Sequence, residues 1–172
     1  MNVMQRRMLD VFEQRQSFYE VLLAGKTRKS SAGAPLKPIK VMSYTYSAQF
    51  TGVAAVALAT NQGVQDSIDT AGNCDFLITY MSAAVFNNAT QALISTPYSR
   101  WNFTDNWSQT PMFDAPIPVS ISTGNGGFPY LLQDPKLIPA NTTIIVTFYN
   151  DSTVGPIVQD ANFAFGGYKI YY

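Results

Sequence analysis

The side chains that most often carry out catalysis are scarce in this chain of 172 residues. It contains no histidine, and its single cysteine, Cys74, stands at the head of an apolar run. Nucleophilic catalysis of the Ser-His-Asp or Cys-His type needs an imidazole, and a structural zinc site needs several Cys or His ligands. The Gly-rich segment 124–127 lacks the lysine of a phosphate-binding loop and predicts a turn. We expect no catalytic residue, no metal, no cofactor and no small-molecule substrate.

Carboxylates are the remaining groups with which the chain could do chemistry. Asp66, Asp69 and Asp75 lie close in sequence and could supply oxygen ligands to a calcium ion, but we favour the simpler explanation, a solvated loop with an aspartate turn. Glycosidic cleavage needs a pair of carboxylates, but no spacing singles out two of the remaining candidates. These candidates are Asp105, Asp114, Asp134 and Asp160. We expect the protein not to be an enzyme.

Aromatic side chains gather at 98–107. Beside Asn, Asp and Arg, such rings can stack on sugars, which would make this segment a glycan-binding loop. The alternative is an aromatic loop that packs over the domain or against a neighbouring subunit, and we favour this interpretation. In either case the candidate contact residues are Tyr98, Arg100, Trp101, Phe103 and Trp107.

The charges sum to zero but are distributed unevenly. Residues 1–40 hold eight Lys and Arg against three acids, a net charge of +5, and residues 41–172 hold three against eight, a net charge of −5. A basic arm on an acidic body indicates either a solvated tail or a second binding surface. An acidic protein partner fits this balance better than nucleic acid does, because the body is itself acidic. Asp10, Glu13 and Glu20 argue against a membrane-bound helix.

Three segments must position these residues. Residues 1–24 predict an amphipathic helix, because apolar side chains recur every three or four positions. Residues 25–38 are basic, polar and proline-containing, which predicts a flexible extended linker. Residues 39–172 alternate in polarity and predict a β-sandwich domain. The arm residues expected to contact a partner are Met4, Met8, Val11, Phe18 and Leu22 on the helix, and the basic Arg6, Arg7, Lys26, Arg28 and Lys29.

The fold class we expect is mainly β: an antiparallel β-sandwich or jelly roll with an N-terminal α-helix and an extended linker. Short strands separated by Gly, Asn and Pro turns indicate this class rather than a parallel α/β sheet. Strands are predicted at 41–47, 53–59, 74–86, 144–149 and 163–171, with short candidates at 117–122 and 131–132.

The C-terminal part resembles a known class of protein. Segments 128–132, 134–146 and 165–171 combine a proline–leucine turn, an alternating strand and a terminal Gly-Tyr-Lys run, and 75–79 matches an earlier strand of the same pattern. They resemble small β-sandwich virion proteins of bacteriophages, similar to capsid decoration (cement) proteins and other minor head components. The resemblance covers about residues 70–172 and does not include the N-terminal helix.

This resemblance implies a non-enzymatic structural protein of the virion capsid, made in the host bacterial cytoplasm. Its partners would be capsid or other virion proteins and copies of itself, with the N-terminal arm as the attachment or oligomerisation element. Two alternatives stay open. One is a carbohydrate- or receptor-binding module that uses the aromatic segment, and the other is a jelly-roll capsid subunit that forms the shell itself.

Overall fold

Alternating side chains and frequent turn residues give a structure made almost entirely of β-strands. The computed structural model describes residues 33, 36, 38–55, 62–95, 97–109, 111–124, 129–151 and 157–172. Their elements are β1 (Lys40–Val53), β2 (Val64–Asp69), β3 (Asp75–Asn87), β4 (Ser99–Asp105), β5 (Ile117–Pro118), the single helical turn α2 (Val119–Ser122), β6 (Tyr130–Ile138), β7 (Thr143–Asn150) and β8 (Gln159–Tyr171).

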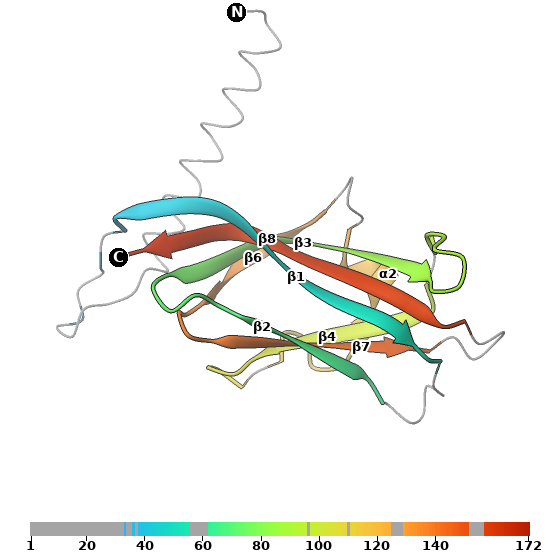
Figure 1. Cartoon of the computed structure of the whole chain (residues 1–172). Helices are drawn as coiled ribbons and strands as arrows, with labels where there is room; N and C mark the ends of the chain where they lie inside the picture. The colour runs from blue at the N-terminus through green and yellow to red at the C-terminus, as the bar shows by residue number, and fades with distance from the viewer. Residues whose placement is uncertain are drawn as a thin grey trace, which may run out of the picture. The chain divides into compact units, whose positions relative to one another are not determined.

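The strands form two four-stranded sheets. One sheet has the order β1-β8-β3-β6 and the other has the order β2-β7-β4-β5. The pairings of β2 with β7, β3 with β6 and with β8, and β4 with β5 and with β7 are antiparallel. Figure 1 shows β1, β8 and β3 running above β2, β7 and β4, so the two sheets face one another as the layers of a sandwich.

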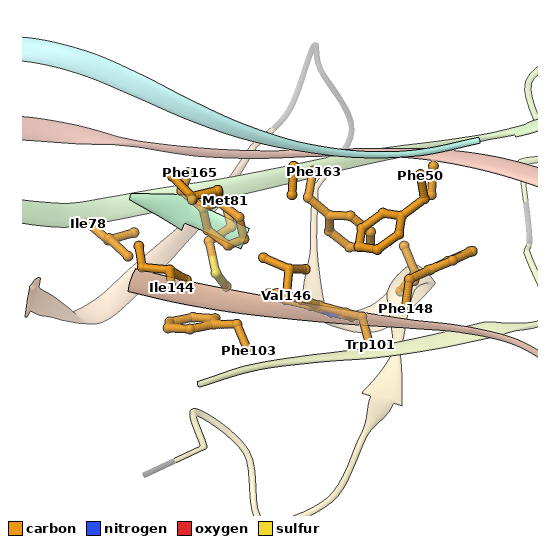
Figure 2. Packing of buried hydrophobic residues seen from close by; sticks show 14 of the residues in the cluster. Phe50, Ile78, Met81, Trp101, Phe103, Ile144, Val146, Phe148, Phe163 and Phe165 are labelled. Carbon is orange, nitrogen blue, oxygen red and sulfur yellow. The ribbon is translucent and has the colours of Figure 1, made fainter. Parts of the chain in front are cut away.

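Large side chains from both sheets fill the space between them. Phe50 of β1 and Phe163 of β8 meet Phe148 of β7, with ring centroids 5.5 to 5.9 Å apart. The indole of Trp101, on β4, lies 5.1 Å from the ring of Phe163. Figure 2 shows these rings between the layers. Fully burying such a side chain contributes about 1.5–3 kcal/mol, so these aromatic residues contribute strongly to holding the two sheets together.

Most of the predicted strands are present in the structure. Those at 41–47, 74–86, 144–149 and 163–171 correspond to β1, β3, β7 and β8, and 131–132 lies inside β6. The candidate at 117–122 is a two-residue strand followed by α2. The prediction at 53–59 is wrong in its described part, because β1 ends at Val53 and residues 54–55 are not in a strand. Residues 56–59 lie outside the described part.

The N-terminal elements are a different case. By its internal contacts the chain divides into one unit of Val41–Tyr171 and another of Met1–Lys40 with Tyr172. The helix predicted over 1–24 lies outside the described residues. So do all of the arm residues named above and nearly all of the linker over 25–38. They therefore stay predictions. Among the helices that the structure does describe, none is long and apolar enough to cross a membrane.

Candidate interaction surface

The aromatic segment at 98–107 contains a strand, not a loop. In β4 buried and half-buried residues alternate along Ser99–Asp105, so successive side chains point to opposite faces of the sheet. Trp101 and Phe103 are fully buried, and the indole Nε1 of Trp101 donates a 2.7 Å hydrogen bond to the hydroxyl of Ser122. Both rings are thus core residues. Neither can stack on a sugar or on a partner while the sandwich is folded.

The other three members of the segment lie at the surface. Tyr98 and Trp107 flank β4 and are 78% and 72% exposed. Arg100 projects from the outer face of β4, where its Nε and Nη2 donate hydrogen bonds of 2.6 and 3.1 Å to the carboxylate of Asp151. This bond raises the pKa of the Arg100 guanidinium. The guanidinium also lies 5.2 Å from the ring of Tyr149. Arg100 therefore fixes the end of β7. Of the aromatic residues predicted to contact a partner or a sugar, Tyr98 and Trp107 are the ones that are exposed.

The aspartates considered for calcium are not brought together. Asp66 of β2 accepts a hydrogen bond from the backbone N–H of Gln49, and Asp69 accepts one from the hydroxyl of Thr143. The buried Asp75 accepts the backbone N–H of Ala140. Across the ranges that the structure describes, no three Asp, Glu, Cys or His side chains cluster as metal ligands do. The calcium alternative has no support at these residues, since each carboxylate is used in a different turn or strand contact.

Asp105 and Lys136 form an ion pair between the two sheets. The Nζ of Lys136, on β6, lies 2.8 Å from Oδ2 of Asp105, at the end of β4. The backbone N–H and the hydroxyl of Ser108 also donate to this carboxylate. Burial acts to raise the pKa of Asp105, but the bonds from Lys136 and Ser108 prevail and lower it below its ordinary value. The carboxylate therefore stays charged and stabilises the packing of β6 on β4.

We expect Lys136→Met to destabilise the domain at neutral pH and to make its stability depend less on pH in the acid range. With its pKa lowered, Asp105 contributes stability above its unfolded pKa of about 4, and that contribution is lost as the pH falls through the folded value. Without the amine, the folded pKa of Asp105 rises toward or above the unfolded value, so this contribution is already missing at neutral pH and less stability is lost on acidification. Urea unfolding from about pH 7 to about pH 3 measures the effect, which should be about 1–3 kcal/mol at neutral pH. Coincident pH profiles for the variant and the wild-type chain would contradict this role of Lys136.

Asp160 is another of the carboxylates considered for glycosidic cleavage. It connects three segments of the chain at one end of β8 by hydrogen bonds. Its carboxylate accepts hydrogen bonds from the backbone N–H of Gly52 and from the side chains of Asn88 and Gln91. The bond from Gly52, followed by those from Gln91 and Asn88, lowers the pKa of Asp160. Gly52 has a φ of +66°, which favours glycine, and nothing lies near the place where its Cβ would stand. Asp160 thus ties β1 and the 87–91 turn to β8.

Exposed apolar side chains gather in two places on this acidic body. The first is the end of the sandwich where β3 leads to β4 and β7 leads to β8. The loops there adjoin, because the N–H of Asn88 donates to the carbonyl of Val158 and the N–H of Asp151 donates to that of Tyr98. The exposed apolar residues of these loops are Leu93, Tyr98, Ile157 and Val158.

The second group lies at the beginning of β1. Val41, Met42 and Tyr44 are 42%, 43% and 44% exposed. The Nζ of Lys169, on β8, lies 3.4 Å from the centroid of the Tyr44 ring and 4.9 Å from that of Tyr46. Burial works against the charged amine, but the hydrogen bond with the Tyr46 hydroxyl prevails and raises the pKa of Lys169. The sequence pattern does not predict this surface, because Tyr44 and Lys169 are far apart in the chain.

The arrangement is suited to covering area on neighbouring molecules. Its exposed apolar and aromatic groups are the kind enriched at the cores of protein interfaces, where charged residues are depleted. Structural hydrogen bonds engage five of the carboxylates: Asp66, Asp69, Asp75, Asp105 and Asp160.

In comparisons with known proteins, the chain matches no protein-family profile, no curated protein and no solved structure.

Proposed function

We propose that this chain is a structural protein of a virion, and that it is a jelly-roll capsid subunit which forms a shell through contacts between its copies. The proposal rests first on the strand order. Neighbours within the sheets include β1 with β8, β2 with β7, β3 with β6 and β4 with β5. These four pairs are the two arms of one long antiparallel ribbon. Wrapping that ribbon so that alternate pairs enter alternate sheets produces the eight-stranded jelly roll, which is the architecture of many viral capsid domains and lectins.

The character of the surface is a second support. Charged residues make up 13% of the chain, about half the usual share, while aromatic residues make up 13%. A monomer that stays in solution benefits from a charged surface, which keeps copies apart. A subunit whose surface is covered by its neighbours has no such need. The exposed apolar groups at the loop end and on β1 fit the second case.

The charge division supplies a third support and a mechanism. The basic arm over 1–40 and the acidic body over 41–172 carry opposite net charges of equal size. Asp69, Asp114 and Asp134 are exposed on the body. In the proposed shell the arm of one copy binds the acidic body of the next. The entropy lost in ordering one arm is offset by contacts that recur around a closed assembly.

Decoration of a shell made by another protein is the second form of this proposal. It follows from the resemblance of residues 70–172 to phage decoration proteins, and it would use the same surfaces. The carbohydrate-binding alternative has weaker support, because Trp101 and Phe103 are buried and only Tyr98 and Trp107 remain to stack on a sugar.

Quantitative mass spectrometry of virions purified from the source of the gene tests the proposal. A shell subunit should be among the most abundant chains in the particle. A decoration protein should be abundant only beside a second, more abundant shell protein. A receptor-binding module should be present in a few copies, and that result, or absence of the chain from the particle, would overturn the proposal.

A further inference from the structure

We infer that β1 pairs, through its free edge, with β1 of a second copy of this chain. The inference rests on the proposed function in that it names one of the contacts between copies. Among the described strands β1 has a single hydrogen-bonded neighbour, β8, so its other side is a sheet edge. The strand is long, with 14 residues, and every residue from Lys40 to Thr45 is exposed.

The edge of β1 differs from the other three edges of the sandwich. Exposed edges invite pairing with other chains, and proteins block them with charges, prolines or very short strands. The other edge strands all use such devices, whereas β1 has no proline and no acid, and its one charge stands on its first residue, Lys40. The devices are Asp66 and Asp69 on β2, residues 134–136 (Asp-Pro-Lys) on β6, and the two-residue length and Pro118 of β5.

A hydrogen bond at Gln49 shows which backbone groups are available for pairing. The N–H of Gln49 donates to the Asp66 carboxylate of β2, 2.9 Å away, so it points to the free edge. Because backbone direction alternates along an antiparallel strand, the N–H groups of Val41, Ser43, Thr45 and Ser47 point to the same edge. The bond to Asp66 occupies the edge at Gln49. Residues 41–47 therefore form the segment open to another strand.

A second copy is the partner that this segment fits. An antiparallel pair centred on residues 41–47 places Tyr44 opposite its own copy, Met42 opposite Tyr46 and Ser43 opposite Thr45. Such aromatic and hydroxyl pairs stabilise cross-strand contacts, whereas like charges directly opposite one another destabilise them. No charged side chain lies within 41–47, so self-pairing places no like charges directly opposite one another on the two paired strands. The pairing joins two four-stranded sheets into one of eight strands about a two-fold axis.

A proline at Ser47 tests the edge. The N–H of Ser47 points away from β8 and its side chain is exposed, so Ser47→Pro should leave the β1–β8 ladder intact while it blocks an added strand. Sedimentation equilibrium of the full chain should show a dimer that Ser47→Pro weakens by about tenfold or more. Ser47→Thr keeps the N–H and should dimerise as the wild type does. Circular dichroism and thermal unfolding establish that both variants are folded.

A cysteine at Tyr44 tests the register independently of the proline. Tyr44 would form a non-hydrogen-bonded pair, in which the Cα atoms lie about 4.5 Å apart, within the range of a disulfide. In a Cys74→Ala background, Tyr44→Cys should form a disulfide-linked dimer under mild oxidation. Thr51→Cys, an exposed position of the same strand beyond the paired segment, should stay monomeric on a non-reducing gel. Equal cross-linking at both positions, or none at either, would overturn the pairing.

These results separate the dimer from the shell. If shells assemble equally well from wild-type and Ser47→Pro chains, and no cross-link forms through Tyr44→Cys, the β1 contact is wrong while the proposed function stands. If the cross-linked dimer forms but no shell appears under any condition, the β1 contact stands and the shell proposal is overturned.

Discussion

Replacing Trp101 by alanine should lower the free energy of unfolding by about 3–5 kcal/mol, the usual cost of truncating a large buried aromatic residue. The side chain is fully buried and lies within 6.1 Å, centroid to centroid, of the rings of Phe103, Phe113, Phe163 and Phe165. Its removal leaves a cavity between the sheets and takes the indole donor from the hydroxyl of Ser122. Urea unfolding followed by circular dichroism measures the change.

Trp107→Ala is the matched control, because the chain has two tryptophans in opposite environments. Trp107 is 72% exposed, so its replacement should change the unfolding free energy by less than about 0.5 kcal/mol. A glycan array distinguishes the functions of the two residues. Sugar binding that is lost in Trp107→Ala but kept in the wild type would favour the carbohydrate-binding alternative. Equal destabilisation by the two substitutions would contradict the assignment of Trp101 to the core.

Neutralising the basic arm should weaken assembly while the sandwich stays folded. Changing Arg6, Arg7, Lys26, Arg28 and Lys29 to glutamine removes five positive charges and brings the net charge of residues 1–40 from +5 to zero. An exposed ion pair contributes about 0.2–1 kcal/mol, so five of them at each contact amount to about 1–5 kcal/mol. The concentration at which the chain assembles should therefore rise about tenfold or more, as measured by light scattering.

The acidic body offers the reciprocal variant. Changing Asp69, Asp114 and Asp134 to asparagine should weaken assembly in the same direction, because in the proposed shell these exposed carboxylates would face the arm of the next copy. High salt should also dissociate wild-type assemblies, since the Debye screening length falls from about 10 Å at 0.1 M to about 3 Å at 1 M ionic strength. Assembly that is insensitive both to the arm substitutions and to salt would show that the arm has no electrostatic role.

The predictable part of the fold is the part in which the sequence pattern is strong. Residues 144–149 are β-branched or aromatic throughout and include one polar residue, Thr147; β7 lies there, with buried Ile144, Val146 and Phe148. The sequence of β2 predicts no strand, because it carries only two large apolar residues, Val64 and Ile68, and its aspartates are typical of a loop. The sequence of β4 predicts a loop, because Arg, Asn, Thr and Asp separate its rings. The alternation of Trp101 and Phe103 at a spacing of two is the pattern that could have identified it.

The candidate surfaces were harder to predict, for a physical reason. Whether a strand lies at an edge depends on the order of strands in the sheet, and that order is set by contacts between residues far apart in the chain. The sequence of β1 shows a strand without charge after Lys40, but only the sheet order places its residues 41–47 beside solvent. The proximity of Lys169 to Tyr44 has the same origin. The charge division, in contrast, can be read from the positions of the charged residues along the sequence.

Assembly of the purified full-length chain tests the central claim most directly. Sedimentation velocity over a range of protein concentrations at low salt, with electron microscopy of the same samples, measures the size and the uniformity of what forms. A shell-forming subunit should give one large species of uniform diameter above a threshold concentration, with smaller species below it. A chain that sediments as a monomer at every concentration, with its circular dichroism showing folded β-structure, would contradict the account.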